Sequence, residues 1–237
     1  MLQTTKGIVL KTIRHGDRTV VLKAYTEEFG LRSYMVRAGG KGGIAQAFLQ
    51  PLNRLELVVN EQTERDIHTI REVRVDKPYT NVPFDPVRGT LALFVQEVLY
   101  KVLRGEAADP GMYGFVQDAL EAMDTTADIR NYPLVFLLRL SGELGFSPAL
   151  PTDGEDRFDL REGEFTQGVV PHGHTLGPPL STHLIALLST DFRTVDGPAI
   201  PAALRRELLD HLLLYFRMHI EGLGELRSPA VLHQVLG

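Results

Sequence analysis

The sequence predicts an α+β protein of two domains, an N-terminal barrel of five strands followed by an all-α helical domain. Up to about residue 77, apolar residues alternate with polar ones, which is the period of half-buried strands. After residue 83 they recur every three to four positions, which is the period of amphipathic helices. Prolines separate the two patterns, and 237 residues suffice for one or two domains. We therefore assign residues 1–80 to the barrel and residues 81–237 to the helical domain.

The N-terminal pattern divides into five strands. Gly and Asp at residues 15–17 and Gly at the end of residues 27–30 tolerate the backbone angles of tight reversals between the first three strands. A short helical turn at residues 44–49 separates the third strand from the fourth. The expected strands are Ile8–Arg14, Thr19–Thr26, Leu31–Arg37, Arg54–Asn60 and Asp66–Val75. Five short strands leave no unpaired edge strand if they close into a barrel. A five-stranded barrel with a helical insert after the third strand is the layout of an OB-fold.

The pattern of the second domain predicts helices, with one long irregular segment between them. Pro201 and Pro229 stand at first-turn positions, where a missing N–H costs nothing. The expected helices run from Asp85 through Val102, then over Tyr113–Met123, Asn131–Leu144, Thr182–Leu188, Ala202–Ile220 and Ser228–Leu236. Between Phe146 and Pro179 the pattern gives way to glycine, proline and charge, with short strands at Arg157–Leu160 and Glu164–Thr166. A segment this long without clear structure is usually functional or degenerate.

Charge is distributed unevenly along the chain. Residues 1–54 hold nine Lys or Arg against three acidic residues, a formal charge of +6, whereas the whole chain carries −5 and is acidic after residue 80. A basic surface suits a polyanion, because each cation placed against a phosphate releases a condensed counterion. The first hypothesis is therefore nucleic-acid contact through the N-terminal domain. The alternative is an incidental basic face on an ordinary domain.

The candidate DNA-binding residues combine cations with aromatic rings. Lys23 and Tyr25 share one face of the second strand, and Arg32 and Tyr34 share one face of the third, because side chains alternate at period 2. We expect the two strands to present both pairs on one surface, where a cation follows the backbone and a ring stacks a base. The alternative places both tyrosines in the barrel core. The full candidate set is Lys11, Arg14, Arg18, Lys23, Tyr25, Arg32, Tyr34, Arg37, Lys41 and Arg54.

The glycine-rich segment 38–43 invites comparison with a phosphate-binding loop. It fails that pattern, because Met35 stands where the first glycine is required and Gly42 follows Lys41 where Ser or Thr is needed. A flexible loop with one lysine contacting a phosphate backbone fits better than a nucleotide site.

Metal and enzyme signatures are weak. His172 and His174 follow an acidic cluster at residues 153–159, but the spacing matches no calcium loop, and solvated charges on an exposed loop are the commoner outcome. The chain has no cysteine, which excludes disulfides, thiolate catalysis and cysteine-based zinc sites. No hydrolase, metalloprotease or kinase motif is present, so we expect no enzyme.

The composition is that of an ordinary globular protein, with 43% hydrophobic and 23% charged residues. The first residues show no basic stretch followed by an apolar one, and no run approaches the roughly 18 apolar residues that a membrane span needs. We expect a cytoplasmic protein that does not bind a membrane.

Several short segments, in this order and spacing, carry a likeness to a known family. They are Gly7–Leu10, Thr26–Leu31, Val36–Gly40, Leu49–Leu52, Leu137–Arg139, Leu144–Pro148, Tyr215–Ile220 and Leu226–Ser228. In these segments the chain resembles the bacterial RecO family of recombination mediator and DNA-annealing proteins. The family's architecture, an OB domain followed by a helical domain, agrees with the one derived above.

The resemblance implies a DNA repair and recombination mediator without enzymatic turnover, associated with the nucleoid. Such proteins bind single- and double-stranded DNA without sequence specificity, anneal complementary strands, and help load RecA onto strands coated by single-strand-binding protein. The implied partners are RecR, which binds the OB domain, and the acidic C-terminal tail of single-strand-binding protein, which docks on the helical domain. For that tail the sequence offers Arg130 and Arg139 beside the apolar stretch 134–140.

The chain departs from the family at the segment matching residues 145–179. Many members carry two Cys-x-x-Cys pairs there, so we expect the zinc to be lost and Phe158–Arg161 with Phe165 to pack the region without metal. The glycine-rich loop is also less basic than in many members. The alternatives are a protein-interaction adaptor that acts only within a complex and, ranked well behind, a metal-dependent hydrolase or nuclease using residues 153–159, His172 and His174.

Overall fold

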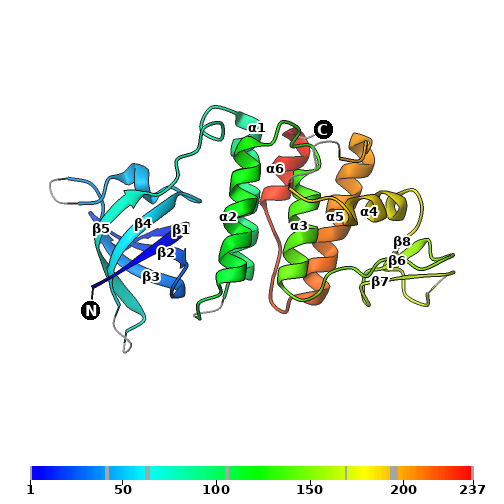
Figure 1. Ribbon diagram of the computed structural model, residues 1–237, viewed down its shortest axis with the longest axis horizontal. Helices are drawn as coiled ribbons and strands as arrows, with labels where there is room; N and C mark the ends of the chain where they lie inside the picture. The colour runs from blue at the N-terminus through cyan, green and yellow to red at the C-terminus, as the bar shows by residue number, and fades with distance from the viewer. Residues whose placement is uncertain are drawn as a thin grey trace. The chain divides into compact units, whose positions relative to one another are not determined.

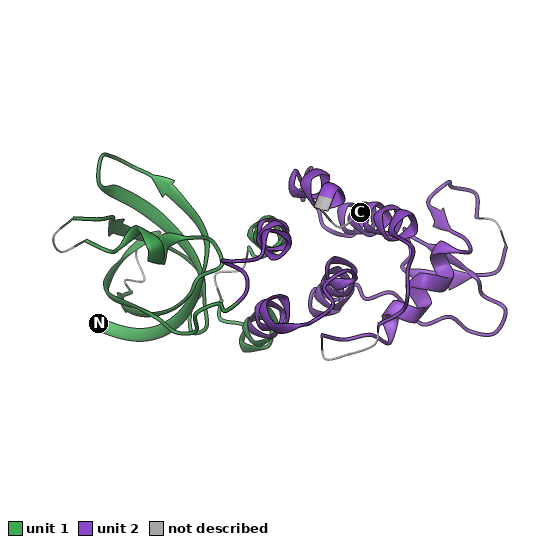
Figure 2. Ribbon diagram, turned by 90° about the horizontal axis from the view of Figure 1, so that it is seen from above, with its two compact units in different colours: residues 1–80, 95–116 green, residues 81–94, 117–237 purple. Residues whose placement is uncertain are grey.

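The computed structural model describes residues 2–40, 43–61, 65–104, 107–168, 170–192 and 197–235. They belong to two compact units, one comprising residues 1–80 and 95–116 and the other residues 81–94 and 117–237 (Figure 2). The barrel unit thus includes the end of one helix and the start of the next. None of the helices in these described ranges combines the length and the hydropathy that a membrane span requires.

Five strands close into a barrel in the order β1-β2-β3-β5-β4 (Figure 1). Neighbours are antiparallel except β3 and β5, which are parallel. The elements are β1 (Leu2–Arg14), β2 (Thr19–Thr26), β3 (Gly30–Arg37), a 3-10 helix η1 (Gln46–Leu49), β4 (Arg54–Asn60) and β5 (Ile67–Val75). This closed barrel with a helical insert after β3 confirms the predicted OB-type layout.

The first strand begins six residues earlier than the sequence predicted. Its N-terminal half pairs with β4, from Leu2 opposite Asn60 to Ile8 opposite Arg54. Its C-terminal half pairs with β2 from Gly7 onward, and the register of this pairing shifts between Val9 and Lys11, just after the pairing with β4 ends at Ile8. The polar residues at the start of β1 are extended because they complete the barrel, which local alternation alone does not reveal.

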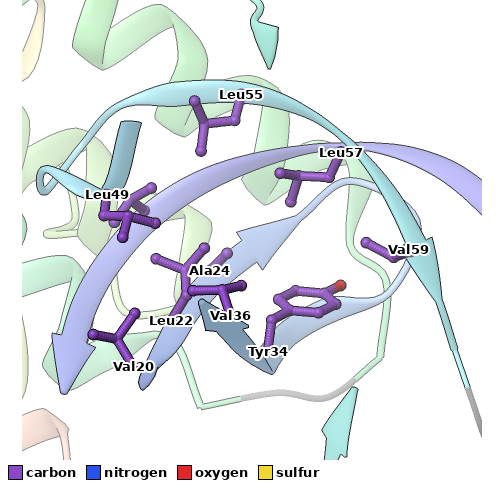
Figure 3. Close-up of a cluster of buried hydrophobic side chains, with 10 residues drawn as sticks. Val20, Leu22, Ala24, Tyr34, Val36, Leu49, Leu55, Leu57 and Val59 are labelled. Atoms are coloured by element: carbon purple, nitrogen blue, oxygen red, sulfur yellow. The ribbon is translucent and has the colours of Figure 1, made fainter. Parts of the chain in front are cut away.

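Ten buried side chains fill the barrel interior (Figure 3). Alternate residues of β2, β3 and β4 point inward, β1 adds Val9, and η1 adds Leu49. The set is Val9, Val20, Leu22, Ala24, Tyr34, Val36, Leu49, Leu55, Leu57 and Val59. Each large aliphatic side chain removed from water in this way contributes about 1.5–3 kcal/mol.

Residues 95–116 cover part of the outer face of the barrel within the same unit. The Gln96 side-chain amide donates to the Leu10 carbonyl at 2.6 Å. The ring of Tyr113 lies 6.0 Å from the ring of Tyr25, centroid to centroid. The outward side of β1 and β2 is therefore partly a packing surface.

The end of the first helix and the start of the second cluster with the barrel unit, and otherwise residues 81–237 confirm the predicted helical region, with six helices in the described ranges. They are α1 (Pro86–Val102), α2 (Pro110–Thr125), α3 (Tyr132–Glu143), α4 (Leu180–Leu188), α5 (Ala202–His219) and α6 (Ser228–Val235). Almost every residue of α3 is buried, and α3 packs against α4 and α5. The buried carboxylate of Asp124 accepts the backbone N–H groups of Asn81 at 2.8 Å and Val82 at 2.9 Å, which anchors the entry to the second unit.

The irregular segment forms a small sheet of its own. Its strands are β6 (Arg157–Asp159), β7 (Glu164–Thr166) and β8 (Thr175–Leu176), in the order β7-β6-β8. The sequence predicted the first two strands and missed β8, because two residues carry no readable alternation. Phe158 and Leu176 are buried in this sheet, and the Phe158 ring lies 5.6 Å from that of Tyr215 on α5.

We predict that Leu57→Ala lowers the free energy of unfolding by about 2–5 kcal/mol, because it leaves a cavity at a fully buried barrel position. Urea denaturation followed by circular dichroism measures this. The control Ile13→Ala removes a side chain that is 40% exposed, and we expect a loss below about 1 kcal/mol. Equal losses would contradict the assignment of Leu57 to the core.

Candidate nucleic-acid interface

The strand register separates the two predicted cation–tyrosine pairs. On β2 and β3, Lys23 is opposite Ser33, whereas Tyr34 is opposite Leu22. Residues directly opposite in an antiparallel pair point to the same face. Tyr34 therefore points inward with Leu22, and Lys23 points outward. The prediction that both pairs share one surface is wrong. The sequence shows which residues of one strand share a face, but it does not show which face of β2 lies beside which face of β3.

Both candidate tyrosines are buried, as the alternative interpretation held. Tyr34 is fully buried among the apolar side chains of the barrel core (Figure 3), and Tyr25 is 3% exposed beneath Tyr113. Burial, and secondarily the charge of Asp109, raises the pKa of Tyr25 to about 12. Burial also raises the pKa of Tyr34, with the charge of Glu61 adding to the effect. Neither ring can stack a base in this structure.

Two of the candidate arginines are bound within the barrel unit. The Arg32 Nε lies 3.4 Å from the Glu61 carboxylate, and the His68 Nδ1 lies 3.4 Å from the same oxygen. Arg54 is 1% exposed, and its Nε donates to the Lys77 carbonyl at 3.2 Å. These contacts hold strands together and leave little of either guanidinium for a ligand.

Three candidate arginines are exposed at one end of the barrel. β1 ends at Arg14, Arg18 lies in the following turn, and β3 ends at Arg37, which is opposite Thr19. The Arg18 carbonyl accepts the Ala38 N–H at 2.8 Å, which brings the turn to the end of β3. Within the part of the chain that the structure describes, none of the three has an ion-pair partner. We call Arg14, Arg18 and Arg37 the arginine rim.

The glycine-rich loop continues from the arginine rim. Gly39 and Gly40 have φ angles of 68° and 72°, a conformation that glycine adopts without strain. Lys41, the candidate within this loop, lies outside the described residues.

The last two candidates lie side by side on the outer face. Lys11 is directly opposite Lys23 in the β1–β2 pair. Their ammonium groups lie 4.6 Å and 5.8 Å from the ring centroid of Tyr100 on α1. The sequence analysis missed Tyr100, because its helix follows the barrel by many residues.

The two arginines predicted for the partner tail differ in their surroundings. Arg139 is half-buried, and its guanidinium donates to the carbonyls of Leu188 and Thr190, at the C-terminal end of α4. Arg130 is exposed and pairs with Asp128, its Nε 2.9 Å from the carboxylate. That hydrogen bond lowers the pKa of Asp128 to about 2. Arg130 thus lies at the surface, while Arg139 supports the fold.

An apolar groove lies beside Arg130. Its floor consists of Pro133 and Leu134 from α3, Leu209 from α5 and Leu232 from α6. Basic groups surround it, namely Arg130, Arg205, Arg206 and His233. We call this the arginine-rimmed groove. Its parts come from three helices that are far apart in the sequence, so the sequence pointed only to Arg130 and to the apolar stretch that begins at Leu134.

The residues of the irregular segment do not fit the zinc that the family resemblance implies. The His172 Nε2 lies 3.1 Å from the Asp159 carboxylate, whose other oxygen accepts the Arg161 N–H at 2.8 Å. His174 lies nearby, its ring 6.0 Å from that of His172. Over the described ranges, no group of three or more His, Cys, Asp or Glu is arranged to hold a metal ion. The Asp159 carboxylate and the His172 ring contact each other instead.

Comparison with known proteins covers nearly the whole chain. The family model described as "Recombination protein O N terminal" matches residues 1–79, and "Recombination protein O C terminal" matches residues 83–229. The protein named "DNA repair protein RecO" of Porphyromonas gingivalis is 32% identical over 242 residues, 98% of each chain. Its namesakes of Bacteroides fragilis and Christiangramia forsetii are 30% and 28% identical, over 99% and 100% of each chain. The chain therefore belongs to the RecO family.

Proposed function

We propose that this protein acts in DNA repair and recombination by binding single- and double-stranded DNA without sequence specificity. It anneals complementary strands and helps to load RecA onto strands coated by single-strand-binding protein. The observation that carries the DNA-binding proposal is the arginine rim, three exposed guanidinium groups that are not ion-paired within the described part of the chain. Family membership supports the role in DNA repair and recombination.

The chemistry of the arginine rim favours phosphate over base recognition. A guanidinium is always charged, and its planar donors match phosphate oxygens in a bidentate way. Contacts to phosphate position a strand but carry no sequence information. Annealing needs two strands to approach despite their charge, and a basic surface lowers that repulsion because its cations neutralise phosphates and replace the condensed counterions. We infer that the protein works by binding, without catalytic turnover.

The arginine-rimmed groove supports a partner in the helical unit. We propose that it binds the acidic C-terminal tail of single-strand-binding protein, with carboxylates on the arginines and an apolar side chain on the leucine floor. Burial, and secondarily the charge of Arg130, lower the pKa of Arg205, with Asp128 acting in the opposite direction. RecR is the partner proposed for the barrel unit.

We also propose that the irregular segment folds without zinc. Phe158 and Phe165 pack at 5.1 Å between ring centroids, and Tyr215 joins them from α5. Burial raises the pKa of Tyr215 to about 12, consistent with a dry interior. These aromatic contacts and the Asp159–His172 pair supply the cross-links that a metal would otherwise provide.

The DNA-binding proposal predicts a steep salt dependence. Affinity for a labelled mixed-sequence single strand should fall by roughly tenfold to a hundredfold between about 50 and about 200 mM salt, measured by fluorescence anisotropy. The double variant Arg18→Glu/Arg37→Glu should lose at least about tenfold at low salt, equally for different sequences.

Arg74→Glu is the matched control, because it reverses a charge on the same barrel at an exposed residue that already pairs with Glu72 at 3.7 Å. We expect this control to change affinity by less than about threefold. A loss that depends on sequence would contradict the phosphate-contact proposal. Undetectable binding even at low salt would favour the adaptor that acts only within a complex.

The groove proposal predicts binding of a fluorescein-labelled peptide with several aspartates and a C-terminal phenylalanine. Arg206→Glu should weaken this binding by about tenfold or more, because it places a like charge beside the peptide carboxylates. Arg217→Glu, on the same helix and also exposed, is the control and should have little effect. Equal losses in both variants would show that general charge, and not the groove, attracts the peptide.

The zinc-free proposal predicts that purified protein contains less than about 0.1 zinc per chain and that a chelator leaves its thermal midpoint unchanged. Phe158→Ala should destabilise by about 3–5 kcal/mol, since it empties the centre of the small sheet. Stoichiometric zinc in the purified protein, measured by atomic emission, would refute the proposal.

A further inference from the structure

Lys11 and Lys23 form an unusual pair of like charges. They are directly opposite one another on antiparallel strands, an arrangement that is destabilising for two cations. Neither has an ion-pair partner among the residues that the structure describes. Both ammonium groups lie over the Tyr100 ring, 4.6 Å and 5.8 Å from its centroid. A ring face offsets such repulsion only weakly at a site open to water.

Tyr100 is held in place by the barrel unit itself. It belongs to residues 95–116, which cluster with the barrel, and Gln96 one turn earlier donates to the Leu10 carbonyl beside Lys11. Its ring is half-buried, in contrast to Tyr25 and Tyr34, which are buried. Of these three tyrosines, Tyr100 alone combines partial exposure with adjacent cations.

We propose that Lys11, Lys23 and Tyr100 form a subsite for an unpaired nucleotide of a single strand. The two ammonium groups leave the ring to contact a phosphate, and the ring then stacks the neighbouring base. A phosphate neutralises the repulsion between the lysines far better than a ring does, because it carries a full charge. This inference rests on the proposed DNA binding and adds to it a preference for single strands, whose bases are open to stacking.

This subsite differs from the arginine rim in the form of DNA that it favours. Guanidinium groups at the rim contact phosphates of single and double strands alike, whereas stacking on Tyr100 requires a base that is not already paired and stacked in a duplex. The subsite should therefore contribute to single-strand affinity and not to duplex affinity.

The chain contains no tryptophan, so Tyr100→Trp introduces a single indole reporter at the subsite. We titrate this variant with a mixed-sequence 20-nucleotide strand and with the corresponding duplex, following tryptophan fluorescence. Stacking against a base should quench the fluorescence with the single strand and leave it nearly unchanged with the duplex. Binding of the single strand, seen by anisotropy, without any change in tryptophan fluorescence would overturn the inference.

A second pair of variants tests the subsite without a reporter. Tyr100→Ala should weaken single-strand binding by about 5- to 100-fold, the range for loss of one stacked base, whereas Tyr100→Phe keeps the ring and should retain wild-type affinity. Duplex affinity should be unchanged in both, and circular dichroism checks that both are folded. Equal single-strand affinity for Tyr100→Ala and wild type would refute the subsite, even if wild-type binding still depended on the arginine rim. Failure of wild type to bind any DNA would instead refute the proposed function.

Discussion

The barrel depends on the pairing of its first strand on both edges. β1 pairs with β4 through its N-terminal half and with β2 through its C-terminal half, with a register shift between them. Without the first pairing, β1 and β4 would each present an open edge, and the interior side chains would face water. The short turns between β1, β2 and β3, together with the buried inner face, fix the register of these strands. This register places Tyr34 on the inner face opposite Leu22 and sets Lys11 opposite Lys23 on the outer face.

In the closed barrel, some basic side chains of the N-terminal segment make internal contacts, and others remain exposed to a ligand. Arg32 contacts Glu61, and the guanidinium of Arg54 lies 4.6 Å from the centroid of the Tyr79 ring while its Nε donates to a carbonyl. A buried guanidinium is tolerated only when such partners replace water. The cations left exposed at the barrel end are fewer than the formal charge of +6 suggests, and they are gathered at one place.

The helical unit shows the same division of roles among arginines. Arg139 donates to backbone carbonyls at the end of α4, where an unpaired C=O would otherwise be partly buried. Arg130, only nine residues earlier, remains at the surface beside the arginine-rimmed groove. The two arginines differ because Arg139 lies on α3, a helix that is buried on nearly all sides, whereas Arg130 lies just before this helix begins.

Hydrophobic periodicity and turn residues were enough to predict the fold class. Four of the five barrel strands and all six helices were predicted to within a few residues, because strong alternation or helical spacing reflects a locally determined preference. The start of β1 and the short β8 escaped prediction, because their extended backbone is imposed by distant partners. The excess of basic residues in the first 54 positions can also be counted directly from the sequence.

The sequence by itself determined the composition of the surface, and the tertiary structure decided its arrangement. Periodicity showed that Lys23 and Tyr25 share a face, but only the β2–β3 register showed that Arg32 and Tyr34 face the other way. Likewise, Tyr100 and the arginine-rimmed groove bring together residues that are far apart along the chain. Local preferences act over a few residues, whereas a binding surface is made by contacts across the whole fold, and those contacts form only when the chain closes on itself.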